Sequence, residues 1–153
     1  MKKYCLVFLL AFMALPAFVS AQEQAPREIP VDDLMQMHRS NVNKFKALVE
    51  RFTAAVEEKE QQSVTVLQKE LLDQMTSQVS YYLNMSKQDA ANPNWKDRYE
   101  KQNDIYKKLE QAKLQIRTNA GMNAALDIVK DLNTFASTME VGLADIEAYL
   151  RNN

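Results

Sequence analysis

The stretch MNAALDIVKDLNTFASTMEVGLADIEAYL, residues 122–150, decides the fold of this chain. Apolar residues recur there every seven positions, at Met122, Val129, Ala136, Leu143 and Leu150, and again three positions later at Ala125, Leu132, Met139 and Ile146. This spacing places all nine side chains on one stripe of an α-helix. A single helix cannot bury such a stripe, so the preceding chain must supply helices that pack against it.

The composition favours an all-α fold with one domain. The chain has 153 residues, of which only two are glycine and four are proline. From residue 31 onward, the only helix-breaking residues are Pro93, Gly121 and Gly142. So few breakers over so long a stretch indicate long helices joined by short connections.

Residues 1–21 have the pattern of a secretory signal peptide. Lys2 and Lys3 precede a nearly continuous apolar run, residues 5–18, and Val19-Ser20-Ala21 supplies the small-x-small motif of a cleavage site. The run is about 14 residues long, shorter than the roughly 20 that span a bilayer. We therefore expect a periplasmic or secreted protein that begins at Gln22.

Cleavage after Ala21 would remove the only cysteine and two lysines. The exported chain would then form no disulfide, and its packing would have to provide its stability. It would carry 17 basic and 20 acidic residues, a net charge of −3. This balance gives no electrostatic reason to expect nucleic acid or an anionic membrane as a partner.

The rest of the chain predicts a short flexible linker, residues 22–30, and then an up-down-up-down antiparallel four-helix bundle. The expected helices are 31–60, 63–88, 94–118 and 122–151. We place a turn at the polar stretch before Ser63, which is a candidate N-cap. Pro93 marks the next break, Asn94 is the expected cap of the third helix, and Gly121 suits that helix's C-terminal end.

The charges of the last two helices are complementary. Residues 94–118 carry a net charge of +3 and residues 122–151 a net charge of −3. In an up-down bundle these two helices are neighbours, so their opposite charges suit each other, although we expect most of these charges to lie on solvated faces.

The residue inventory disfavours enzymatic chemistry. His38 is the only histidine, the exported chain has no cysteine, and two isolated glycines cannot form a phosphate-binding loop. A common zinc site takes three or four ligands, typically His and Cys, which this chain cannot supply. We therefore expect a non-enzymatic binding or structural module whose partner is another envelope protein or a second copy.

The bundle topology gathers one class of side chain at one end. The start of the first helix, the end of the second, the start of the third and the end of the fourth meet there. The residues concerned are Met35, Met37, His38, Tyr81, Tyr82, Met85, Trp95, Tyr99 and Tyr149. The candidate binding residues are His38, Tyr81, Tyr82, Trp95, Tyr99 and Tyr149, since Tyr and Trp are enriched at interfaces. The simpler alternative is that these rings close the bundle, with His38 bonded to a tyrosine hydroxyl or to Asn41.

A second hypothesis is a copper or haem protein that uses Met35, Met37 and His38. Thioether and imidazole ligands suit Cu(I). The expected architecture also resembles cytochrome b562, an exported four-helix bundle. The resemblance implies haem held between an early methionine, which Met35 would match, and a histidine near the end of the last helix, which is missing from residues 149–153.

Overall fold

A computed structural model describes residues 29–152 as four α-helices. They are α1 (Val31–Glu57), α2 (Gln61–Gln88), α3 (Pro93–Gln111) and α4 (Asn119–Asn152), and the described residues contain no strand. The predicted signal peptide and residues 22–28 of the predicted linker lie outside these residues. Ile29 and Pro30, the described end of that linker, are exposed and not helical.

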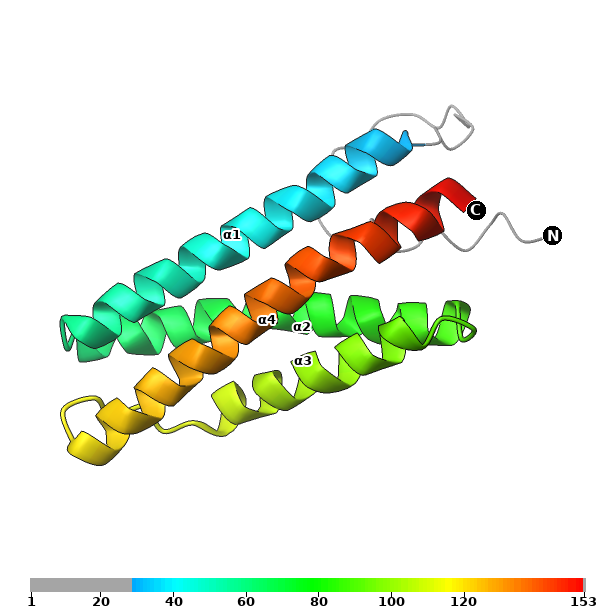
Figure 1. The fold of residues 1–153 in the computed structure, drawn as a ribbon. Coiled ribbons are helices and arrows are strands. Elements are labelled where there is room, and N and C mark those ends of the chain that lie inside the picture. Colours follow the sequence, from blue (N-terminus) through cyan, green and yellow to red (C-terminus); the bar gives the residue numbers. More distant parts are fainter. Residues whose placement is uncertain (1–28, 153) are drawn as a thin grey trace, which may run out of the picture. The chain divides into compact units, whose positions relative to one another are not determined.

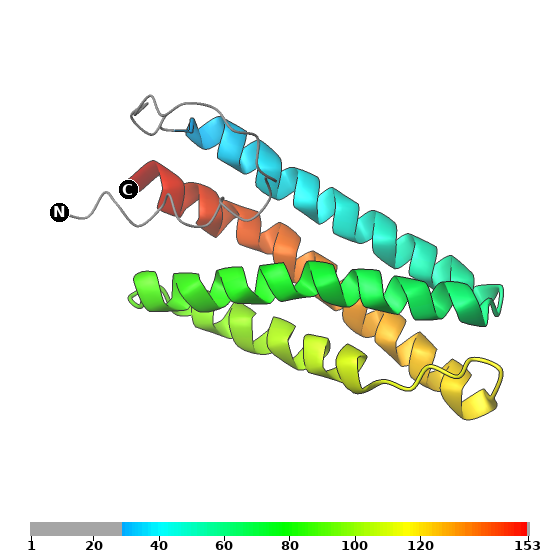
Figure 2. The same ribbon diagram turned by 180° about the vertical axis from the view of Figure 1, so that it is seen from behind.

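The four helices pack as a bundle, as predicted. Each helix packs on the one before it and the one after it, and α1 also packs on α4, which closes the ring. Successive helices run in opposite directions (Figures 1 and 2). The diagonal partners are therefore α1 with α3 and α2 with α4.

The apolar stripe of α4 is confirmed in part. Ala125, Leu132, Ala136, Met139 and Ile146 are buried as predicted. The other four predicted core positions are not fully buried, and the seam instead includes residues one position before the predicted ones. The deeply buried residues of this second row are Gly121, Ile128, Phe135 and Gly142. Met122, Val129, Leu143 and Leu150 are only partly buried. The buried face of α4 therefore includes two glycines, which cannot be recognised as core positions by looking for large apolar residues.

The turn between α1 and α2 is formed by Glu58, Lys59 and Glu60, slightly earlier than predicted. The Lys59 N–H donates to the Val56 carbonyl and the Glu60 N–H donates to the Ala55 carbonyl, at 3.2 and 2.9 Å. This pair of bonds is the Schellman motif, whose central residue adopts a left-handed conformation. Lys59 has a φ of 59°, so a lysine occupies a position that usually holds glycine.

Two predicted helix caps are wrong. Glu60, not Ser63, is the N-cap residue of α2, and the Ser63 hydroxyl instead donates to the Glu60 carboxylate at 2.7 Å. Asn92, not Asn94, caps α3, because Pro93 takes the first helical position, where its missing N–H costs nothing. The Asn92 side chain accepts from the Asn94 N–H at 3.1 Å.

The third helix ends at Gln111, seven residues before the predicted end at 118. Two glutamines of α2 provide the physical reason, because their amides bond the backbone that follows. Gln68 donates to the carbonyls of Leu109 and Ala112, at 2.8 and 3.1 Å. Gln61 donates to the Leu114 carbonyl at 2.7 Å and accepts from the Ile116 N–H at 2.9 Å. These bonds hold the non-helical segment after Gln111 against α2, and its side chains Leu114 and Ile116 are buried in the core.

Gly121 does not end α3, contrary to prediction; it lies in the first turn of α4. The Thr118 hydroxyl accepts from the Gly121 N–H at 3.0 Å and so caps α4. A Cβ at position 121 would collide with the Gln115 carbonyl. Glycine is required here by the close approach of the preceding loop.

Replacing Lys59 with glycine should raise the free energy of unfolding by about 1 kcal/mol, because glycine adopts positive φ without the steric cost borne by other residues. Urea denaturation measures the change. Lys59→Ala is the matched control, since it removes the same charge but keeps the Cβ, and it should give no gain. Equal stabilisation by both variants would contradict this account of the turn.

Candidate functional site

One end of the bundle has a hydrophobic cluster separate from the main core, and we call this cluster the aromatic end. Its buried members are Met35, Tyr82, Met85, Trp95 and Ile146. Its partly buried members are Val31, Tyr81, Tyr99, Leu143, Tyr149 and Leu150. All four helices contribute, so the predicted gathering of aromatic side chains at this end is found in the structure.

The aromatic rings form a continuous chain of contacts. The His38 ring lies 5.1 Å from that of Tyr81, which lies 5.5 Å from Tyr82. The chain continues from Tyr82 to Trp95 at 6.1 Å and from Trp95 to Tyr149 at 6.4 Å, measured between ring centroids. Tilted and edge-on pairs at these separations are favourable for aromatic rings.

Burial divides the predicted binding residues into two groups. Tyr82 and Trp95 are 0% exposed, so they belong to the interior and offer no surface. The Trp95 indole N–H donates to the Asp89 carboxylate at 2.8 Å. The other four residues, His38, Tyr81, Tyr99 and Tyr149, are partly exposed.

The environment of these rings favours their neutral forms. Burial raises the pKa of Tyr82 to about 12, and it raises the pKa of Tyr81 as well, with the neighbouring tyrosines adding to the effect. Burial lowers the pKa of His38 below 6.5. Among the described residues His38 makes no hydrogen bond; it packs on Tyr81, and so the expected bond to a tyrosine hydroxyl or Asn41 is wrong.

Tyr82 reaches across the bundle from α2 to the diagonal helix α4. A Cβ built on Gly142 would overlap the Tyr82 hydroxyl and lie 3.3 Å from its ring carbon Cζ. The hydroxyl is buried without a hydrogen-bond partner, and Gln78 lies near it but outside hydrogen-bonding geometry. The glycine therefore makes the space that the tyrosine fills.

Arg98, which was not among the predicted site residues, lies beside this contact, with its Cδ 3.5 Å from the position of a Cβ on Gly142. It forms an ion pair with Asp145, joining α3 to α4, and its guanidinium carbon lies 5.6 Å from the centroid of the Trp95 ring. Its side chain is 11% exposed. Lys108 and Asp131 form a second α3–α4 pair at 3.0 Å, so the predicted charge complementarity is confirmed.

Gln102 is buried in the same region, and it too was not predicted. It is 0% exposed, and neither its amide oxygen nor its amide nitrogen has a partner among the described residues. The sequence carried a signal for it, because Trp95, Gln102 and Leu109 follow the heptad spacing and all three are buried. A polar residue at such a position is easily mistaken for an interruption of the stripe.

The three residues proposed for copper or haem do not all lie on one face of α1. Met35 is 2% exposed whereas Met37 is 45% exposed, because a two-residue step on a helix turns through about 200°. His38 lies one turn from Met35, with its ring against Tyr81. Among residues 29–152, no group of three or more His, Cys, Asp or Glu side chains is placed to hold a metal ion.

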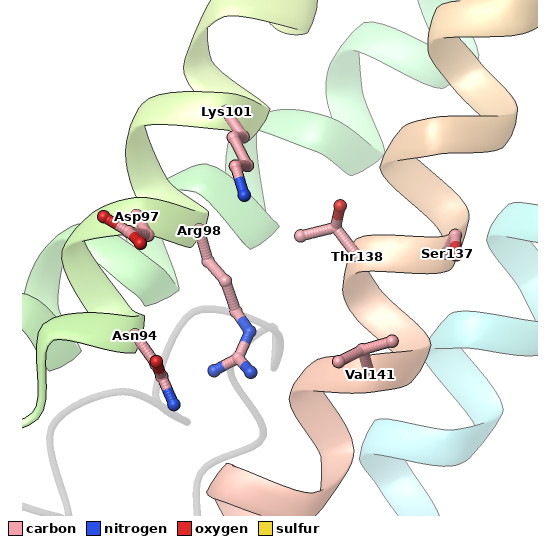
Figure 3. Close-up of a pocket in the computed structure, with 7 residues that line it drawn as sticks. All are labelled: Asn94, Asp97, Arg98, Lys101, Ser137, Thr138 and Val141. Atoms are coloured by element: carbon pink, nitrogen blue, oxygen red, sulfur yellow. The ribbon is translucent and has the colours of Figure 1, made fainter.

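A shallow groove of about 220 Å³ lies between α3 and α4, beside the Arg98–Asp145 pair (Figure 3). It is lined by Asn94, Asp97, Arg98, Lys101, Ser137, Thr138 and Val141. Figure 3 shows Arg98 and Lys101 extending from α3 toward the groove, while the Asp97 carboxylate points away from it.

No protein-family model, curated protein or solved structure matches this chain. None of the described helices combines the length and the apolar character needed to cross a lipid bilayer. Function must therefore be inferred from the residues and their geometry.

Stability should fall as the pH drops below about 6.5, because His38 is held neutral in the folded protein. The pKa of His38 is lower in the folded protein than in the unfolded chain, so on acidification the unfolded chain binds a proton at this imidazole first. The free energy of unfolding is therefore highest above the unfolded pKa and decreases as the pH falls below it. Urea denaturation between about pH 7.5 and about pH 5.5 measures this loss. Carboxylates titrate mainly at lower pH, so His38→Gln should make stability flat across that window; an unchanged slope would contradict the assignment.

Gly142→Ala should destabilise the protein by about 1–3 kcal/mol, because the new methyl group overlaps the Tyr82 hydroxyl. Adding Tyr82→Phe should recover part of the loss, because it removes the overlapping oxygen. A double-mutant cycle by chemical denaturation measures the coupling between the two positions. Strictly additive effects would show that the two residues do not compete for the same space.

Proposed function

We propose that this chain is exported and acts without catalysis as a binding or structural module, with the aromatic end as its contact surface. Its partner would be another envelope protein or a second copy, in the periplasm or outside the cell. The observation that carries the proposal is the continuous chain of rings from His38 to Tyr149, contributed by all four helices.

The proposal of export is supported by the first 21 residues. They combine a positive start, a short apolar run and a small-x-small motif that ends at Ala21. The loss of Cys5 on cleavage would suit a compartment in which thiols are oxidised, since no cysteine would be left to mispair.

The aromatic end has the composition of a protein contact surface. Its buried rings form the base of the surface, and Tyr81, Tyr99 and Tyr149 are partly exposed above them. Tyrosine, tryptophan, methionine and arginine are the residues enriched where proteins meet. A base already fixed in the free protein loses little conformational entropy on binding.

Charged residues of α1 and α4 lie along one side of this surface. Arg151 contacts Asp32 at 3.2 Å and Glu147 at 2.7 Å, and Arg39 lies 3.9 Å from Glu147. These contacts join the start of α1 to the end of α4. An apolar centre with a polar, solvent-accessible rim is the usual anatomy of a specific protein interface.

The chemical state of the reactive groups supports a non-enzymatic role. The single imidazole is packed against a tyrosine ring, and Tyr82 is fully covered. A tyrosine phenol is already protonated at neutral pH, and burial raises the pKa of Tyr82 further, so this group offers no base. The groups that most often carry acid–base chemistry are thus engaged in packing.

Replacing Tyr81 and Tyr149 with glutamine should weaken capture of the partner from an envelope extract, because both substitutions remove aromatic contact area from the aromatic end. The bait is the chain from Gln22, and bound material is quantified by mass spectrometry. Sedimentation of the bait alone tests whether the partner is a second copy. The fully buried Trp95 is a poor choice for this test, because its removal would damage the core.

Val66→Gln with Leu126→Gln is the matched control. Both residues are large, apolar and exposed, at 53% and 42%, and they lie near the opposite end of the bundle. The control should bind as the parent does, with the helical circular dichroism of all baits unchanged. Equal capture by parent, test pair and control would defeat the proposed surface.

A further inference from the structure

We propose that the groove between α3 and α4 is a binding site for a carboxylate attached to an apolar group, either a small aliphatic acid or the free carboxyl terminus of a peptide. The site is distinct from the contact surface proposed above. It depends on Lys101, Arg98 and Val141, and not on the exposed residues of the aromatic end.

The groove presents a cation without a counter-ion. Lys101 extends toward it in Figure 3 and makes no ion pair or hydrogen bond with the described residues. Asp97, one turn earlier on α3, points away from the groove. Lys96, also near the start of α3, is already paired with Glu100. The ammonium of Lys101 is therefore the charge that a ligand can neutralise.

Arg98 makes the second wall of the groove and is held in a fixed position. Asp145 pairs with its Nη2, and the Trp95 ring lies under the guanidinium. Its Nη1 is buried without a hydrogen-bond partner among residues 29–152. A guanidinium fixed from two sides costs little further ordering when an anion approaches its exposed edge.

The charge balance points to one negative charge on the ligand. Asp145 already neutralises Arg98, and the carboxylate of Asp97, the acidic residue among those that line the groove, points away from it, so Lys101 is the cation that faces the groove without a counter-ion. A carboxylate matches this requirement, whereas a phosphate, with up to two charges at neutral pH, would bring excess negative charge close to Asp145.

The opposite wall explains why the ligand should also be apolar. Val141 is 64% exposed, the most exposed of the large hydrophobic residues described, and it lines the groove. Ser137 and Thr138 lie one turn before it, and the Ser137 hydroxyl makes no hydrogen bond with the described residues. A volume of about 220 Å³ corresponds to several water molecules at roughly 30 Å³ each, enough for a carboxyl group with a short alkyl chain.

Titration followed by amide NMR tests the site on the purified protein. The probes are hexanoate, hexanol, acetate, inorganic phosphate, and a leucine-ended peptide with a free or an amidated carboxyl terminus. Hexanoate or the free-ended peptide should shift the amides of Asn94, Lys101 and Val141, and should do so at lower concentration than any other probe. Binding of the peptide but not of hexanoate identifies a carboxyl terminus as the ligand, and the reverse identifies a small acid.

Lys101→Gln should weaken binding at least threefold, and Lys107→Gln should leave it unchanged. Both lysines are exposed on α3, but Lys107 does not line the groove, so the pair separates local recognition from the general loss of a charge. Val141→Thr, which keeps the shape but adds a hydroxyl, should also weaken binding of hexanoate. The proposal is overturned if hexanol binds as well as hexanoate, if phosphate binds better, if the two lysine variants lose equally, or if no amide shifts at millimolar concentrations.

Discussion

The contact between Tyr82 and Gly142 is the constraint on which the aromatic end depends. Tyr82 belongs to α2 and Gly142 to α4, two helices that face each other diagonally, so the tyrosine crosses the centre of the bundle. With any larger residue at position 142 the ring would have to move, and Trp95, which packs 6.1 Å from it, would move as well. The ring chain is thus set by the absence of one Cβ.

The same level of the bundle carries a polar layer between two hydrophobic clusters. The main core extends as far as Val42 on α1 and Ile105 on α3, and the aromatic end begins beyond them. His38, Arg98 and Gln102 occupy the positions between, and the Tyr82 hydroxyl lies beside Arg98. Buried polar groups without partners cost about 1–3 kcal/mol each, so this layer is not explained by stability. The layer separates the main core from the aromatic end.

The sequence predicted the helices well and their ends less well, for reasons that differ from residue to residue. Helix α2 was predicted at 63–88 and is observed at Gln61–Gln88, because its buried positions all hold apolar or aromatic side chains. The left-handed turn at Lys59 could not be predicted, because a lysine side chain gives no indication of a positive φ. The early end of α3 depends on Gln61 and Gln68, which lie more than forty residues earlier in the chain and act only once α2 packs on α3. Local periodicity contains no information about such long-range bonds.

The residues of the groove were harder to predict than those of the aromatic end, and the difference is physical. Aromatic side chains at a bundle end follow from topology alone, because large apolar rings must lie where helices meet. Arg98 and Asp145 look like ordinary surface charges in a sequence, and only the packing of α3 on α4 brings them together and leaves Lys101 unpaired beside them. Hydrophobic pattern therefore locates the core of a small bundle, whereas its polar recognition sites depend on how adjacent helices are rotated. The one-residue shift of the α4 seam, toward Gly121 and Gly142, is such a rotation.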